Sequence, residues 1–333
     1  MIALDHLRPP VPGDASAPAY KDWLHVNVFD HSTGAVGLVN VSLHGQPGTK
    51  VARAVGTALI ELPGAGWIGN LDVRPLDEAR VSTEAISLDR IAVGIDSRSG
   101  LIMASALLPD DGLQGSLTAT VTGPPLIVAD PTPVSQGWIG WYAFPRLAVK
   151  GELRLGQETL ALEHCSGYAD HNWGRWFWGQ GLGWDWGTFM CAGDGPTVVL
   201  SQLADRLQRP VAAPLLEVRV AGTRRRFAAP AVSMEWSGVL EATPRRLPGA
   251  LAALFTDRAA PRLPARLTVR GDDGIDTVEV TFTARAAAQL ILADPVYHGY
   301  SFLHELVGTC SCRCTIQGMP FDGSGLAVVE RVD

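Results

Sequence analysis

The sequence has little charge and no long apolar run. Charged residues make up 18% of the 333 residues and the net charge is −7, so the general basic excess typical of nucleic-acid-binding proteins is absent. No window approaches the roughly 20 apolar residues that a membrane-spanning helix requires. The N-terminus lacks a basic start followed by an apolar stretch, which excludes a secretory signal. We therefore expect a cytoplasmic protein with no nucleic-acid partner.

Basic residues gather at only two places, Arg224–Arg226 and Arg245–Arg246. A solvated face is the simplest interpretation of such a cluster. A patch that rests on the anionic inner face of a membrane is the alternative, so peripheral membrane contact stays open. The sequence does not fix the oligomeric state.

Cysteine is also scarce. The chain has five, an odd number, which favours free thiols in a protein that is not exported. Cys310, Cys312 and Cys314 stand at alternate positions and would share one face of a strand. Metal sites usually show a gap of two to four residues within each pair and a second pair elsewhere. Because neither is present, we predict a buried apolar strand in place of a metal site. The functions considered below also require no metal or organic cofactor.

Familiar catalytic motifs are missing too. Neither a G-x-S-x-G elbow nor an H-E-x-x-H zinc motif occurs. Residues Gly64–Gly69, "GAGWIG", match a dinucleotide-binding pattern, but that pattern needs a helix directly after it. Pro75 interrupts the following segment early and the surroundings resemble strands, so we predict a β-turn.

The segments that are present resemble strands. They are short, rich in β-branched residues, and bounded by turns that the 36 glycines and 23 prolines supply. Only residues 248–260 resemble a helix, and residues 283–292 fit either a helix or a strand. We predict an all-β protein of two consecutive antiparallel barrel or sandwich domains, residues 1–178 and 179–333.

One segment, residues 166–187, holds five of the ten tryptophans. In an extended chain Tyr168, Asp170 and Asn172 point to one face, and His171 and Trp173 to the other. Burial of Asp170 among aromatic rings would favour the protonated acid, which can donate a proton at neutral pH. The alternative is structural: Asp170 and His171 bond turn amides or Arg175 and only pin a hairpin.

Further along, Trp184 and Trp186 share one face and Asp185 lies on the other. Core packing explains most buried tryptophans. So many indoles in one stretch would also suit a pocket for a long apolar ligand, and electron-rich rings stabilise a carbocation.

"GYADHNWGRW" (residues 167–176) followed by "GWDWG" (residues 183–187) resembles the signature of the lipocalin-like carotenoid 1,2-hydratases, or hydroxyneurosporene synthases. Their superfamily includes attachment-type lipocalin-like proteins and decalin-forming Diels–Alderases. "GWIGWYAFPRLAVKGEL" (residues 137–153) resembles the aromatic strand that precedes this signature. The resemblance implies two calycin-like β-domains with an apolar cavity near their junction.

The resemblance also assigns roles. Tyr168 and Asp170 would belong to the active site, with Asp170 protonating a terminal isoprenoid double bond. Either Trp138 or Trp141 matches the tryptophan that the family carries on the upstream strand. The family's histidine on that strand has no counterpart here, and Ala169 stands where a histidine is usual. These differences leave the substrate open.

Three functions follow from these features. The first is hydration or cyclisation of an isoprenoid or polyene, with Asp170 as general acid and Tyr168 or Asn172 holding its carboxyl group. The second is a pericyclase that folds a polyene and polarises a carbonyl through Tyr168 or Asn172. The third is a non-catalytic lipid or isoprenoid carrier. Candidate substrate-binding residues are Trp138, Trp141, Asn172, Trp173, Trp176, Trp184 and Trp186.

A glycosidase that uses Asp170 and Asp185 is disfavoured. Its two carboxylates would have to flank one glycosidic bond, and these two positions lie on separate predicted strands that do not obviously converge.

Overall fold

The computed structural model describes residues 6–11, 13–96, 98–205, 207–247, 262–294 and 296–332. Strands make up 67% of these residues, which confirms the predicted all-β class. The helical elements among them are three single 3₁₀ turns, η1 (Ala17–Ala19), η2 (Leu76–Glu78) and η3 (Pro109–Asp111). Within the same described ranges, no helix is long and apolar enough to cross a membrane.

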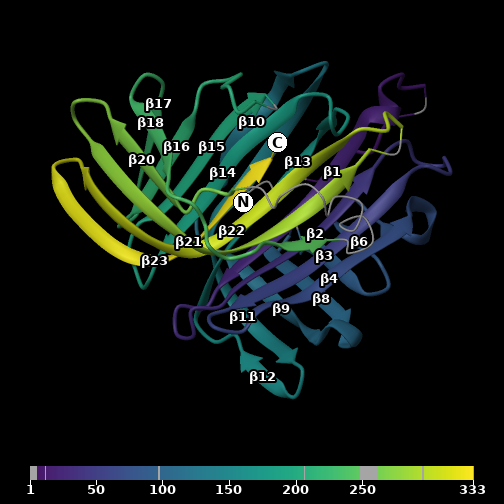
Figure 1. The fold of residues 1–333 in the computed structure, drawn as a ribbon, viewed down its shortest axis with the longest axis horizontal. Coiled ribbons are helices and arrows are strands. Elements are labelled where there is room, and N and C mark those ends of the chain that lie inside the picture. Colours follow the sequence, from purple (N-terminus) through teal and green to yellow (C-terminus); the bar gives the residue numbers. More distant parts are fainter. Residues whose placement is uncertain are drawn as a thin grey trace. The chain divides into compact units, whose positions relative to one another are not determined.

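The chain divides into two compact units by its internal contacts. Unit 1 comprises Met1–Gln180 and Ala293–Tyr300, and unit 2 comprises Gly181–Leu292 and Ser301–Asp333. A short segment from the second half of the chain therefore belongs with the first half. Figure 1 shows the strands of both units.

Unit 1 is built on a 13-stranded sheet in the order β4-β3-β2-β1-β13-β11-β9-β8-β7-β6-β5, with β10 and β12 paired to β11. The pairings between these described strands are antiparallel. The strands are β1 (Tyr20–Phe29), β2 (Val36–His44), β3 (Arg53–Leu62), β4 (Gly66–Pro75), β5 (Arg80–Val81), β6 (Ala85–Ser87), β7 (Ile91–Asp96), β8 (Leu101–Leu108), β9 (Leu113–Val121), β10 (Leu126–Val134), β11 (Gly137–Leu155), β12 (Glu158–Ala161) and β13 (Cys165–Arg175).

Side-chain alternation gives the central strands of unit 1 two different faces. On β1, Leu24, Val26 and Val28 pack into one continuous apolar core. His25 and Asn27 lie between them in sequence and therefore point to the opposite face. Both faces of β1 are buried apart from the half-buried Trp23, and the second face carries polar and aromatic side chains.

Strand β13 lies between β1 and β11, and this register sets the candidate site. Asp170 stands opposite His25 on β1 and opposite Ala143 on β11. Asn172 stands opposite Trp141. Cross-strand partners share a face of the sheet, so these side chains gather on the face away from the apolar core.

Unit 2 is built on a 10-stranded sheet in the order β17-β16-β15-β14-β23-β22-β21-β20-β18, and β19 pairs in parallel with β21. Its long strands β21, β22 and β23 curve together in Figure 1. The strands are β14 (Leu182–Cys191), β15 (Thr197–Asp205), β16 (Leu215–Val220), β17 (Thr223–Ala228), β18 (Val232–Ser237), β19 (Arg245–Leu247), β20 (Arg266–Asp272), β21 (Thr277–Ala293), β22 (Tyr300–Ile316) and β23 (Met319–Val332).

The cysteine prediction is confirmed in unit 2. Cys310, Cys312 and Cys314 alternate along β22, are buried, and belong to the apolar core of this unit. All five cysteines are buried, and none of them forms a disulfide.

The turn predicted at residues 64–69 is confirmed at its start: residues 63–65 join β3 to β4, whereas residues 66–69 belong to β4. Gly64 and Gly66 adopt positive φ angles of +81° and +79° that favour glycine. Residues 283–292, which fit either a helix or a strand by sequence, are part of β21. The predicted helix at residues 248–260 lies outside the described residues.

Candidate functional site

The face of the unit 1 sheet that lies away from the apolar core carries polar and aromatic side chains in place of aliphatic ones. We call it the polar face. Its central members are buried, with Asp170 and His25 each 5% exposed. Its residues are Lys21, Trp23, His25, Asn27, Asn40, Ser42, His44, Trp141, Tyr168, Asp170 and Asn172.

The Asp170 carboxyl group is the centre of this face and accepts three side-chain hydrogen bonds. The Trp141 indole Nε1 donates to Oδ2 over 3.0 Å, and the Tyr168 hydroxyl donates to the same oxygen over 2.9 Å. The Asn172 amide Nδ2 donates to Oδ1 over 2.7 Å. The sequence predicted that Tyr168, Asp170 and Asn172 share a face, and the structure confirms it and adds Trp141.

Two of these donors, the indole N–H of Trp141 and the amide NH₂ group of Asn172, cannot accept hydrogen bonds. They therefore stabilise negative charge on Asp170 and fix the plane of its carboxyl group. The bonds differ from the structural alternative considered above, in which Asp170 bonds turn amides or Arg175. Arg175 instead pairs with Asp14 over 3.1 Å.

Beside Asp170 lies a chain of three polar side chains. The Asn40 Nδ2 atom is 3.5 Å from His25 Nδ1, and His25 Nε2 is 3.0 Å from Asn27 Oδ1. Burial lowers the pKa of His25 to about 4, partly offset by its bond to Asn27, so the ring is neutral at pH 7. These residues were not predicted from the sequence, although alternation along residues 23–27 places Trp23, His25 and Asn27 on one face.

An aromatic cluster occupies one end of the polar face. Trp176 packs edge-on against Trp23 at 5.5 Å between ring centroids and against Trp178 at 5.8 Å. The Trp178 indole donates to His44 Nδ1 over 3.3 Å. Burial, with the charge of Lys21, lowers the pKa of His44 to about 3. Trp176, a predicted substrate-binding residue, therefore lies among tryptophans at this end.

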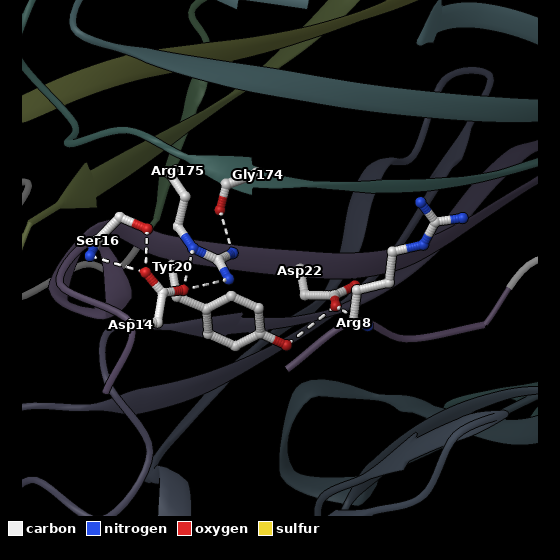
Figure 2. A network of polar contacts seen from close by, with 7 residues as sticks. All are labelled: Arg8, Asp14, Ser16, Tyr20, Asp22, Gly174 and Arg175. Atoms are coloured by element: carbon white, nitrogen blue, oxygen red, sulfur yellow. Dashed lines mark hydrogen bonds and ion pairs between the residues drawn. The ribbon is translucent and has the colours of Figure 1, made fainter. Parts of the chain in front are cut away.

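The opposite face of β13 holds a separate polar network that faces the apolar core. The Asp22 carboxylate receives the Tyr20 hydroxyl over 2.9 Å, the Arg8 backbone N–H over 2.7 Å and His171 Nε2 over 2.7 Å. Figure 2 shows Asp22 between Tyr20 and Arg8, with Arg175 reaching Asp14 nearby. His171 thus ties β13 to β1, the structural role predicted for it.

Trp173 and Trp138, both predicted to bind substrate, lie on this second face and not beside Asp170. Trp173 stacks on His171 at 4.9 Å, and the Arg8 guanidinium lies 4.0 Å from the centroid of its ring. Trp138 stands opposite Arg175, whose guanidinium lies 5.5 Å from the Trp138 ring. Of the two tryptophans on the upstream strand, Trp141 is the one that reaches Asp170.

Trp184 and Trp186 lie in unit 2, on the face of its sheet away from the apolar core. The Trp184 indole donates to the Glu330 carboxyl group, and Glu330 stands directly opposite Glu305 in the sheet. Burial raises the pKa of Glu330 to about 7, against the opposing hydrogen bonds from Trp184 and Glu305. This buried carboxyl pair was not found from sequence, because β22 and β23 show no signal of their register.

Asp185 points to the other side of β14, as predicted. Its carboxylate lies 3.6 Å from Arg331 and 3.3 Å from the Trp236 indole nitrogen. Across the described ranges, no group of three or more His, Cys, Asp or Glu residues is arranged to hold a metal ion.

Comparison with solved structures shows that this fold is shared over the whole chain. A candidate AttH protein of Nitrosomonas europaea has a TM-score of 0.66 at 16% identity, covering 97% of this chain and 99% of its own. Kievitone hydratase of Nectria haematococca has a TM-score of 0.62 at 11% identity, covering 99% and 98%. CghA has a TM-score of 0.67 at 12% identity, covering 100% and 95%.

At such low identity these likenesses show the lipocalin-like two-domain fold alone. No protein-family model matches the sequence. No curated protein matches it either.

Proposed function

We propose that the polar face of unit 1 is the site of a cofactor-independent enzyme that protonates a C=C bond of an apolar isoprenoid or polyene. Asp170 is the general acid, and the product is a hydrated or cyclised substrate. The observation that carries this proposal is the buried Asp170 carboxyl group held by Trp141, Tyr168 and Asn172. The fold supports it, since kievitone hydratase is similar over 99% of this chain.

The three donors suit an acid whose target is a weak base. The reaction requires the protonated form of Asp170, which burial of the side chain favours. Its proton passes to one alkene carbon, where the π electron pair forms the new C–H bond. The carboxylate left behind meets donors that are already in place from Trp141, Tyr168 and Asn172. Preorganised donors aimed at developing charge lower the barrier, because they need no reorganisation during the reaction.

The polar face also supplies the groups that stabilise the carbocation formed by this proton transfer. Proton transfer leaves a carbocation on the neighbouring carbon, and the rings of Trp141 and Tyr168 are held beside Asp170 to stabilise it. A water molecule then forms a C–O bond and returns a proton to Asp170, or an internal alkene closes a ring and returns a proton from carbon. Either route restores the neutral acid.

The pericyclase and the carrier are weaker candidates. A pericyclase would use Tyr168 or Asn172 to polarise a substrate carbonyl, but both donate to Asp170. A carrier would need a large apolar cavity, and the cavity of about 30 Å³ within the apolar core of unit 1, bordered by residues that include Val28, Leu117 and Leu162, is too small for a lipid.

The test is Asp170→Asn assayed with a panel of linear isoprenoids, with hydrated and cyclised products followed by mass spectrometry. Asparagine keeps the size of the side chain and cannot act as the acid, so we expect turnover to fall by about 10²–10⁴-fold. Asp130→Asn, at an exposed position on β10, is the matched control and should retain turnover.

Unchanged turnover in Asp170→Asn would remove the acid mechanism and leave the pericyclase standing. If the wild-type chain yields no product from any substrate but carries a lipid when purified, the carrier is the better account.

A further inference from the structure

Asn27 carries a buried donor with no acceptor. Its side chain is 0% exposed, and its Nδ2 atom has no hydrogen-bond partner among the described residues. Buried polar groups in native proteins are almost always paired. An unpaired buried donor at a candidate site therefore points to a ligand atom that completes it.

The neighbouring residues hold the Asn27 amide in this orientation. Asn40 presents its Nδ2 donor to His25 Nδ1, so His25 carries its proton on Nε2. That proton is donated to Asn27 Oδ1 over 3.0 Å. The Asn27 oxygen therefore already accepts a hydrogen bond, and the NH₂ group is the part of the amide that has no partner. Because burial keeps His25 neutral at pH 7, this arrangement holds over the physiological range.

Asn27 also has the right position to serve the reaction of Asp170. It stands directly opposite Tyr168 in the sheet, two register positions along from the His25–Asp170 pair. Two residues along a strand span about 7 Å, and opposed side chains share a face. A ligand lying along β13 would therefore contact Asp170 and Asn27 at two points about 7 Å apart.

We propose that Asn27 is a specificity-determining residue that donates a hydrogen bond to an oxygen of the substrate. The substrate class is then an oxygenated polyene or isoprenoid, with a carbonyl, hydroxyl or ether oxygen a few bonds from the double bond that Asp170 protonates. A pure hydrocarbon would leave the Asn27 donor unpaired and bind less tightly, since sites built to hydrogen-bond a group reject analogues that lack it. This role rests on the proposed function of the polar face.

The experiment compares two probes of equal chain length, the aldehyde farnesal and the hydrocarbon β-farnesene. Their dissociation constants are measured on the full chain by quenching of tryptophan fluorescence. We expect wild type to bind farnesal about tenfold more tightly than β-farnesene, the effect of one buried hydrogen bond. Asn27→Leu should bring the two constants within about twofold by weakening farnesal binding alone.

Asn27→Asp is the second variant, because it keeps an acceptor for His25 and replaces only the unpaired donor. It should lose the preference for farnesal as well. Asn70→Leu is the matched control, since Asn70 lies on β4 and bonds Asp111 outside the polar face; it should keep the wild-type preference.

Equal binding of both probes by wild type, or a preference for farnesal that survives in both Asn27 variants, overturns the role of Asn27. The Asp170→Asn variant distinguishes failure of the Asn27 proposal from failure of the proposed function. It should bind both probes as wild type does while losing turnover. Unchanged turnover in Asp170→Asn with an intact effect of Asn27 would refute the acid and keep the oxygen contact.

Discussion

The Lys21 ammonium and the Asp294 carboxylate lie 3.2 Å apart in unit 1, with both side chains fully buried. Burial lowers the pKa of Lys21, and Asp294 is the main opposing influence. Asp294 has further support, since its oxygens accept the backbone N–H groups of Trp178, Val296 and Tyr297. The charge of Lys21 therefore depends on Asp294 more than the charge of Asp294 depends on Lys21.

We expect Asp294→Asn to lower the free energy of unfolding by about 3–5 kcal/mol, because it leaves a buried ammonium without its counter-charge. Lys21→Met should be milder, since the carboxylate keeps its three backbone donors. Urea unfolding of both variants checks the order. Equal losses, or a larger loss for Lys21→Met, would contradict this account of the pair.

At the same scale, alternation within one strand was enough to predict that Tyr168, Asp170 and Asn172 share a face. It could not choose between Trp138 and Trp141, because that choice depends on the register of β11 against β13. Nor could it bring Asp294 to Lys21 or His25 to Asp170. Those pairs join residues far apart in the chain, and no local pattern encodes which strands become neighbours.

Among the elements, β23 shows how glycine lets a neighbouring strand approach. A Cβ atom at Gly325 would lie 2.0 Å from the backbone oxygen of Met190, and one at Gly323 would lie 3.0 Å from Cys191 Cβ. These two positions on β23 leave room for Cys191 of β14 within the same core as Cys310 and Cys312 of β22. The thiol-rich core of unit 2 thus depends on the bare backbone of β23.

Gly325→Ala is expected to lower the free energy of unfolding by about 1–3 kcal/mol or more, because the added methyl group can fit only if the backbone shifts. Gly37→Ala on β2 is the matched control, since its Cβ would meet nothing closer than 3.7 Å. Thermal unfolding of the two variants gives the comparison. Equal stability of Gly325→Ala and wild type would show that β14 and β23 can move apart to admit the methyl group with no loss of free energy of unfolding.

The alternation of the three cysteines predicted the buried face of β22 from sequence, because period two is a property of the strand itself. The glycines on β23 that support this core were not predicted. Glycine is required there because Met190 and Cys191 approach β23 closely, and only the pairing of β14 with β23 reveals that approach. The sequence therefore predicted the type of element and which side chains share a face, but not how closely two neighbouring strands approach each other.

For the molecule as a whole, the buried titratable groups differ between the two units. In unit 1, burial lowers the pKa of His25 to about 4 and of His44 to about 3. In unit 2, burial lowers the pKa of His304 to about 4 but raises that of Glu330 to about 7. The depressed aspartates of both units titrate below their ordinary value of 3.8, outside the range from pH 6.5 to 4.5.

The sign of the effect follows from proton uptake. A histidine whose folded pKa lies below 6.5 takes up a proton on unfolding, so its contribution to stability falls as pH drops below 6.5. A glutamate whose folded pKa lies above 4.5 releases a proton on unfolding, so its contribution rises as pH falls from 7 to 4.5. Unit 1 has two destabilising histidines against the one acid proposed at Asp170, whereas in unit 2 His304 and Glu330 oppose each other one to one.

Acidification from pH 7 to 5 should therefore loosen unit 1 before unit 2. Hydrogen exchange followed by mass spectrometry, corrected for the intrinsic rate at each pH, should show protection falling in β1, β2 and β13 while β14, β22 and β23 change little. Glu330→Gln removes the compensating proton and should make unit 2 lose protection as well, because His304 then acts unopposed. Wild-type unit 2 losing as much protection as unit 1 would mean that other groups govern the acid response.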